Sequence, residues 1–184
     1  SNYENYLLKK IKENRGKILN ARVTDLYNTE TCIRLETSSR NAVFANRVFD
    51  SRPPTPTNKT IFQHFLGWEI TTNKSVFDET LVTLMDFRVP QEDGFHFMYV
   101  LPYSETCALI ESTVYSDTML NPQWYENQIT KYLTNVIQCT SWDVVNKEQG
   151  AIPLNYNKDL KPLGTPIGLN AGAMRASTGY AFSQ

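Results

Sequence analysis

The sequence contains few of the residues from which metal sites and disulfide frameworks are built. Among its 184 residues there are two histidines and three cysteines, and neither type has a metal-ligand or paired spacing. No Gly-x-Ser-x-Gly turn is present, which argues against an α/β-hydrolase. The formal net charge is −1 with both signs interspersed, so we expect no basic surface for nucleic acid. The sequence therefore predicts no metal, no nucleic-acid partner and a reducing compartment.

Long hydrophobic runs are also missing. No apolar stretch approaches the roughly 20 residues of a spanning helix, and the N-terminus lacks the short apolar core of a signal peptide. What is present is a chain that is 41% hydrophobic and rich in tyrosine and phenylalanine. This composition predicts a soluble globular chain, and leaves peripheral membrane contact open. The aromatic content is typical of a β-rich core, and it also permits a large apolar pocket.

The first part of the chain has the pattern of a helix followed by short strands. Apolar residues recur at helical spacing over 3–14. Three segments separated by polar clusters then predict a small β meander, at 18–26, 31–37 and 41–49. The prolines of 52–57 cannot continue a central strand, because they lack the backbone donor. We interpret this proline segment as the internal boundary of the chain.

Beyond the boundary the pattern indicates an antiparallel sheet. Candidate strands lie at 60–70, 81–89, 95–101 and 106–115, and a further one at 142–147. The connections between the first four are short and rich in turn residues, which suits antiparallel neighbours. Asn121 followed by Pro122 predicts a helix start, and the apolar stripe of that helix should pack on the sheet. The predicted fold class is α+β.

Carboxylates on the predicted strands are the first candidates for chemistry. Side chains alternate along a strand, which places Glu111 on the same face as Leu109. A carboxyl among apolar neighbours can stay protonated and act as a general acid. Asp86 shares a face with Arg88 and can form an ion pair with it, and Glu69 is similarly ambiguous. Because acidic residues are rarely buried, the pattern alone favours a structural role for all three.

The last segment is rich in small residues. Gly168, Gly172 and Gly179 allow a close backbone approach to a ligand, and backbone donors there can hold a phosphate or the edge of a ring. A flexible tail that contains glycine is an equally good interpretation.

Several of these stretches, taken together and in order, resemble the lycopene cyclase family, particularly its bacterial β-cyclase branch, which is FAD-dependent. The matching segments are 48–53, with an Asp-x-Arg pattern; 63–70; 84–86, with a Met-Asp pair; 94–102; 109–113; and 171–180. The segment 109–113, Leu-Ile-Glu-Ser-Thr, is similar to the family's Leu-x-Glu-x-Thr motif. The family's N-terminal dinucleotide-binding βαβ unit has no counterpart here, so the resemblance covers the central and late portion only.

The resemblance implies an organisation for the chain. It would be the antiparallel substrate domain of a hydroxylase-like flavoprotein, with partial flavin-binding elements. Residues 1–52 would belong to the FAD-binding domain, as a helix plus a small β meander. Residues 53–155 would form the substrate-binding domain with one packed helix, and 156–184 would return to the FAD site. The implied flavin contacts are Gly172, Ala173, Met174, Ser177, Thr178, Gly179 and Tyr180.

The resemblance also implies an activity in carotenoid biosynthesis. A lycopene cyclase protonates the terminal double bond of lycopene, the next double bond attacks the cation, and loss of a proton leaves an ionone ring with no net redox change. Glu111 would be the acid, and Asp86 a secondary carboxylate in the same cavity. The implied cofactors are reduced FAD and NAD(P)H as its reductant, in a cytoplasmic enzyme with peripheral membrane contact.

Two other kinds of protein stay open at this point. One is a related FAD-dependent monooxygenase or a prenyl or lipid reductase, in which the same sheet would bind a different substrate. The other is an isolated substrate domain that has no activity by itself.

Overall fold

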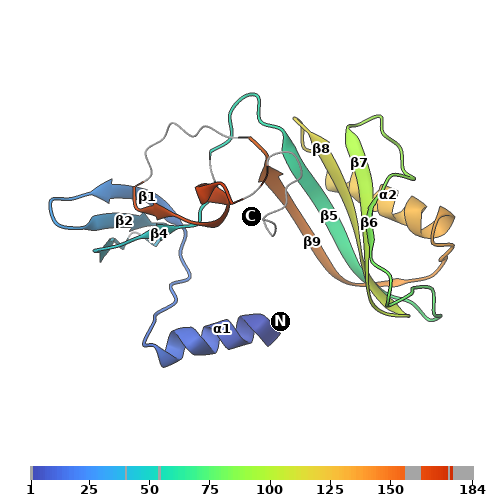
Figure 1. Cartoon of the computed structure of the whole chain (residues 1–184), viewed down its shortest axis with the longest axis horizontal. Helices are drawn as coiled ribbons and strands as arrows, with labels where there is room; N and C mark the ends of the chain where they lie inside the picture. Colours follow the sequence, from blue (N-terminus) through green and yellow to red (C-terminus); the bar gives the residue numbers. More distant parts are fainter. Residues whose placement is uncertain (1, 40, 54, 156–162, 174, 176–184) are drawn as a thin grey trace. The chain divides into compact units, whose positions relative to one another are not determined.

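The computed structural model describes residues 2–39, 41–53, 55–155, 163–173 and 175. The chain divides into two compact units. Unit 1 comprises Ser1–Asp50 with Lys161–Pro166, and unit 2 comprises Ser51–Leu160 with Ile167–Gln184. Their elements are labelled in Figure 1. The assignment of cofactor and substrate roles to the predicted ranges 1–52, 53–155 and 156–184 stays a prediction.

Unit 1 contains one helix and two small sheets. Its helix is α1 (Asn2–Glu13), and its strands are β1 (Val23–Asn28), β2 (Ile33–Thr37), β3 (Val43–Ala45), β4 (Phe49–Asp50) and β10 (Thr165–Pro166). The first three strands form an antiparallel sheet in the order β1-β2-β3, and β4 pairs in parallel with β10. The predicted helix and β meander are confirmed. The short β4–β10 pairing was not predicted, because it joins segments that are far apart in the sequence.

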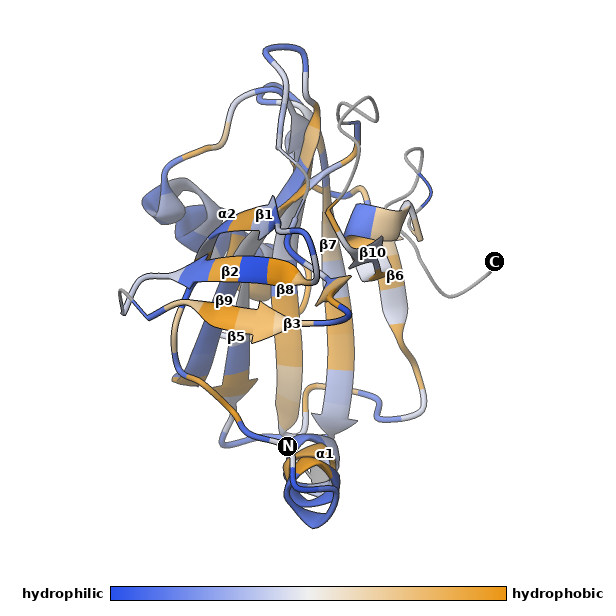
Figure 2. Cartoon of the chain, turned by 90° about the vertical axis from the view of Figure 1, so that its left-hand side faces the viewer, coloured by the Kyte–Doolittle hydropathy of each residue, from blue (hydrophilic) through white to orange (hydrophobic). Residues whose placement is uncertain are grey.

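Helix α1 is amphipathic. The side chains of Tyr3 and Tyr6 are more than half exposed. The Lys10 ammonium forms an ion pair with Glu13 at 2.9 Å, a spacing that stabilises exposed helices. Figure 2 shows the hydrophobic residues of α1 on one side and hydrophilic turns on the other.

Unit 2 is built on a five-stranded antiparallel sheet with the strand order β6-β7-β8-β5-β9. Its strands are β5 (Phe62–Thr71), β6 (Thr83–Asp86), β7 (Phe95–Ser104), β8 (Cys107–Ser116) and β9 (Asp143–Pro153). The predicted antiparallel sheet is confirmed. The strand predicted at 81–89 is much shorter, and β6 contains a register irregularity and a positive φ of 54° at Met85. The strand predicted at 142–147 is longer, because β9 pairs with β5 along its whole length.

Helix α2 (Pro122–Asn135) covers one face of this sheet (Figure 1). The Asn121 side chain accepts a hydrogen bond from the Gln123 backbone N–H at 2.9 Å, and Pro122 occupies the first turn, so the predicted helix start is confirmed. The even-numbered residues of β5, β7 and β8 face α2 and form the core with it. The buried core comprises Leu66, Trp68, Ile70, Phe77, Met98, Val100, Ala108, Ile110, Val114, Tyr125, Ile129, Tyr132 and Leu133.

The η1 turn (Gly168–Ala171) completes the described elements. Neither α1 nor α2, nor any other helix in the described part of the chain, has the length and apolar character to span a bilayer.

Candidate active site

Glu111 lies on the face of the sheet that points away from α2. Its strand neighbours Ile110 and Ser112 are fully buried on the α2 side, so alternation directs Glu111 to the opposite side. We call this opposite side the open face. The strand register places Tyr99 of β7, Gly67 of β5 and Glu148 of β9 in one row with Glu111 of β8. Four neighbouring strands therefore contribute to the same line of side chains.

The Glu111 carboxyl is partly buried and is held in place by its own strand. The Thr113 hydroxyl donates to Glu111 Oε1 at 2.6 Å. Burial raises the pKa of Glu111 to about 7, the Thr113 hydrogen bond opposes this shift, and the nearby Glu148 carboxyl adds to it. At neutral pH Glu111 therefore populates both the acid and the carboxylate form. A carboxyl with such a pKa is suited to general acid–base chemistry.

A group of aromatic rings covers the open face beside Glu111. Phe97 is fully buried at the centre of this group, although it faces away from the main core. Its ring packs edge-on against Tyr99, Tyr115 and Phe87, with centroid distances of 5.2, 5.6 and 5.8 Å. Phe95 also contacts this group and is half exposed. The result is an apolar surface with several π faces next to the carboxyl.

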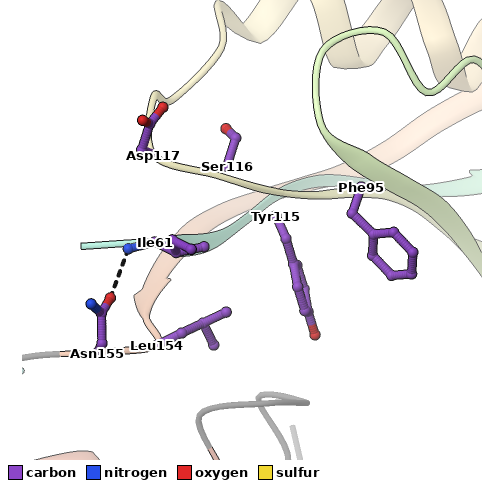
Figure 3. A pocket seen from close by; sticks show the side chains of 7 residues that line it. All are labelled: Ile61, Phe95, Tyr115, Ser116, Asp117, Leu154 and Asn155. Atoms are coloured by element: carbon purple, nitrogen blue, oxygen red, sulfur yellow. Dashed lines mark hydrogen bonds between the residues drawn. The ribbon is translucent and has the colours of Figure 1, made fainter. Parts of the chain in front are cut away.

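A pocket of about 630 Å³ opens at one end of the open face. It is lined by Ile61, Phe95, Tyr115, Ser116, Asp117, Leu154 and Asn155. Figure 3 shows the side chains of Phe95, Tyr115 and Leu154 projecting toward the same space. Tyr115 lies four residues along β8 from Glu111 and on the same face, which corresponds to roughly 13 Å at the usual rise of a strand. Phe95 and Tyr115 belong both to the aromatic group and to the pocket lining, so the aromatic surface beside Glu111 extends to the pocket.

Asp86 lies on the α2 side of the sheet. The Tyr132 hydroxyl of α2 donates to Asp86 Oδ2 at 2.6 Å, and Arg88 Nε donates to Oδ1 at 2.9 Å. The Arg88 hydrogen bonds hold the pKa of Asp86 well below its usual range, and the Tyr132 bond adds to this effect against the opposing influence of burial. The ion pair expected from the sequence is confirmed.

The expectation that Asp86 and Glu111 share one cavity is wrong. Asp86 pairs with Met98 in the strand register, and Met98 is buried in the core under α2. The two carboxylates therefore occupy opposite faces of the sheet. The structure does not bring Asp86 to Glu111. The Asp86 carboxylate is therefore not on the open face, where the expected catalytic role would require it.

Both histidines are buried on the α2 side. His64 hydrogen-bonds to the Tyr125 and Ser116 hydroxyls, and His96 to the Pro90 carbonyl and the Ser112 hydroxyl, so each ring is bound through both nitrogens. Burial lowers the pKa of each. Within the described ranges, no three His, Cys, Asp or Glu residues are placed so that they could hold a metal ion.

The predicted flavin contacts fall mostly outside the described residues. Met174, Ser177, Thr178, Gly179 and Tyr180 lie there. Gly172 and Ala173 are described, and their backbone N–H groups donate to Leu169 O at 3.0 Å and to Gly168 O at 3.2 Å. These two donors close their own turn, and the expected flavin contacts stay a prediction.

Gly67 and Glu148 were not expected from the sequence as members of the row through Glu111. Gly67 lies inside β5, and a glycine within a strand is a recognised sign of close approach by another group. Glu148 was missed because the predicted strand ended at residue 147. The polar run Asn-Lys-Glu-Gln at 146–149 has no alternating apolar pattern that would have extended the predicted strand to it.

The fold is similar to part of several solved structures. The chain is similar to a geranylgeranyl bacteriochlorophyll reductase-like protein from Thermoplasma acidophilum, with a TM-score of 0.71, 11% identity, and coverage of 97% of this chain and 49% of that one. It is also similar to a flavoprotein/dehydrogenase from Cytophaga hutchinsonii, with a TM-score of 0.52, 13% identity, and coverage of 81% and 41%. At these identities the likeness concerns the fold alone.

The sequence comparisons define the family. The lycopene cyclase protein family model matches residues 1–184, and the chain belongs to this family. It is 31% identical over 154 residues to a lycopene beta-cyclase of Pseudescherichia vulneris, covering 77% of this chain and 38% of that protein. It is 33% identical over 133 residues to the lycopene beta-cyclase of Pantoea ananas, covering 66% and 33%. The chain thus spans well under half the length of the curated relatives it matches.

Proposed function

We propose that this protein acts as a lycopene cyclase in carotenoid biosynthesis, an intramolecular lyase or isomerase that closes ionone rings on lycopene. The observation that carries the proposal is the Glu111 carboxyl, which is partly buried beside an aromatic surface and has a pKa of about 7. It lies within the Leu-Ile-Glu-Ser-Thr segment that resembles the family motif. Membership of the family supports the same substrate class.

In the proposed reaction Glu111 is the proton donor. The Thr113 hydroxyl donates to Oε1, which leaves Oε2 to carry the acidic proton. That proton passes to the terminal double bond of lycopene, and Glu111 becomes a carboxylate beside the new cation. The next double bond attacks the cation and closes the ring, and the ring cation then returns a proton to the Glu111 carboxylate, which gives a neutral product and restores the acid. General acid catalysis of this kind typically contributes about 10² to 10⁴ in rate.

The aromatic rings of the open face serve the same reaction in two ways. Their π faces attract a positive charge within about 6 Å, which stabilises the cation. The buried ring of Phe97 and its neighbours also exclude water, which would otherwise capture the cation. The apolar polyene then lies along this surface toward the pocket at Tyr115.

The cofactors of the proposed enzyme are FAD in its reduced form and NAD(P)H as the reductant. The family resemblance and the flavoprotein fold support this assignment. Because cyclisation leaves the oxidation level of lycopene unchanged, the flavin is not consumed as an electron donor to the product. The proposed location is the cytoplasm. Peripheral membrane contact is part of the proposal because lycopene is a lipid.

The decisive test replaces the acid and keeps the shape of its side chain. Glu111→Gln, made in the gene that encodes this chain and expressed in a lycopene-producing host, should lower ring formation by about 100-fold or more, because glutamine cannot donate the proton. Cyclised and linear carotenes are separated by chromatography. Glu69→Gln is the matched control, since Glu69 lies on the same face but outside the row through Glu111.

Full ring formation by the Glu111→Gln variant would rule out this mechanism. Oxygen uptake is measured in the same extracts, because a monooxygenase would consume oxygen during substrate turnover and a cyclase would not.

A further inference from the structure

Gly67 leaves a gap in the row of side chains that runs across the open face. A Cβ atom at this position would lie 3.1 Å from Glu148 Cγ and 3.2 Å from Glu148 Oε1. It would also lie 3.1 Å from Leu109 Cδ1. The Glu148 side chain therefore occupies the space above the Gly67 backbone that any other residue would fill.

This gap lets two carboxyls from non-adjacent strands meet. Glu111 and Glu148 both pair with Gly67, one from each side, so their backbones are separated by two strand spacings of roughly 4.8 Å each. A glutamate side chain spans most of one such spacing. Glu111 in its protonated form donates a hydrogen bond to Glu148, and the negative charge of Glu148 disfavours ionisation of Glu111. Two carboxyls placed in this way share a proton, because ionisation of both would bring two negative charges close together.

The other groups near Glu111 and Glu148 do not cancel the interaction between these two carboxyls. On the open face Glu111 has Thr113 from its own strand and Tyr99 from β7, and Tyr103 and Glu69 lie further along. Lys147, the basic residue next to Glu148, places its ammonium 5.3 Å from the Trp68 ring centroid and bonds to Glu126 of α2. Its charge is therefore engaged on the α2 side.

The two members of the pair differ in exposure, which decides where the proton resides. Glu148 is exposed, whereas Glu111 is partly buried. Burial penalises the charged form, so Glu111 is the member of the pair that keeps its proton.

We propose that Glu148 is a positioning residue, which shares a proton with Glu111 across Gly67 and thereby maintains the acid form of Glu111 at neutral pH. The proposal rests on the proposed function, in which Glu111 is the proton donor. It adds a second carboxylate to the site, and this carboxylate is Glu148 of β9 in place of Asp86.

The first experiment needs no catalytic activity. In the full 184-residue chain, the side-chain carboxyl carbons of glutamate are labelled with ¹³C and titrated by NMR, and the Glu111 signal is assigned from Glu111→Gln. Glu148→Gln should lower the titration midpoint of Glu111 by about one pH unit, the usual scale of coupling in acid pairs. Gly67→Ala should act in the same direction, because the added methyl group pushes the Glu148 side chain away.

The matched control is Glu69→Gln, which removes a like charge from the same face and should leave the Glu111 midpoint unchanged. Circular dichroism confirms that each variant is folded. An identical Glu111 midpoint in the unaltered chain and in Glu148→Gln overturns the proposal. An equal shift in Glu69→Gln also overturns it, since the effect would then be a general one of surface charge.

The second experiment measures cyclisation against pH. Glu111 must be protonated to act, so activity falls as pH rises through its pKa. In Glu148→Gln this decline should move to lower pH, while the rate on the acidic side is retained. An equal loss of rate at every pH would assign Glu148 a structural role and overturn the proposal. Absence of cyclisation in the unaltered protein would refute the proposed function, and the NMR titration would still decide whether the pair exists.

Discussion

Two strand carboxylates that have similar sequence surroundings acquire opposite chemical properties in this protein. Asp86 accepts hydrogen bonds from a cation and from the Tyr132 hydroxyl, so it stays ionised. Glu111 accepts a bond from the neutral Thr113 hydroxyl and lies beside apolar rings, so its acid form is favoured. The difference arises from the partners that the fold supplies. It accounts for one residue that is suited to structure and one that is suited to proton transfer.

Asp86→Asn should therefore reduce stability and leave ring formation intact. The carboxylate is 7% exposed and Arg88 is 69% exposed, so the variant loses charged hydrogen bonds without burying a lone cation. We expect a loss of about 1–3 kcal/mol in the free energy of unfolding at pH 7, measured with urea. Glu92→Gln, an exposed carboxylate on a loop, is the control and should change little.

The stabilisation that Asp86 provides should depend on pH in a direction that follows from its pKa. The folded-state pKa of Asp86 is depressed, so its contribution is present above the unfolded pKa of about 3.9 and is lost as pH falls below it. The difference between Asp86→Asn and the unaltered chain should shrink on acidification. A difference that stays constant down to pH 2, or a loss of cyclisation in this variant, would contradict the assignment.

At the scale of elements, the packing of α2 on the sheet holds the open face in position. The helix contributes Tyr125, Ile129, Tyr132 and Leu133 to the core, on the side of the sheet opposite Glu111. Because α2 buries the centre of one face, the opposite face can stay open without loss of the core. The helix is thus structural, and the site depends on it only through the sheet.

Ile129→Ala tests this division of roles. Ile129 is fully buried, and removal of a buried aliphatic side chain costs about 2–5 kcal/mol through lost transfer energy and the cavity left behind. We expect a loss of that size in chemical denaturation. The adjacent and exposed Thr130→Ala should cost far less. Equal losses of unfolding free energy in the two variants would show that the face of α2 that carries Ile129 is not packed in the core.

At the scale of the whole molecule, unit 2 contains its own core. Every buried member of that core lies between Leu66 and Leu133, and β9 completes the sheet by pairing with β5 over ten positions. A fragment of residues 51–155 should therefore unfold cooperatively, as followed by circular dichroism during heating.

A shorter fragment of residues 51–142 is the matched control. It lacks β9, which leaves the long edge of β5 unpaired and prone to association with other chains. We expect it to aggregate or to lose its cooperative transition. Cooperative unfolding of the shorter fragment but not of the longer one would contradict the assignment of β9 to this unit.

Much of the fold and part of the site follow from local sequence patterns alone. The alternation along 107–116 places Glu111 away from Ile110, the stripe after Asn121 specifies α2, and the short turns specify antiparallel strands. These features depend on neighbouring residues only, so they can be predicted. The Leu-Ile-Glu-Ser-Thr segment, together with the matching segments before and after it, selected Glu111 as the candidate acid.

Only the tertiary structure decided which residues share a surface with Glu111. Strand order and register depend on pairing between segments that are distant in the chain, and a shift by one residue would exchange the two faces. For this reason the sequence did not reveal that β9 lies beside β5, or that Glu148 reaches across Gly67. It also did not reveal that Asp86 faces α2. The sequence determined the proposed acid, and the packing of distant strands determined its environment.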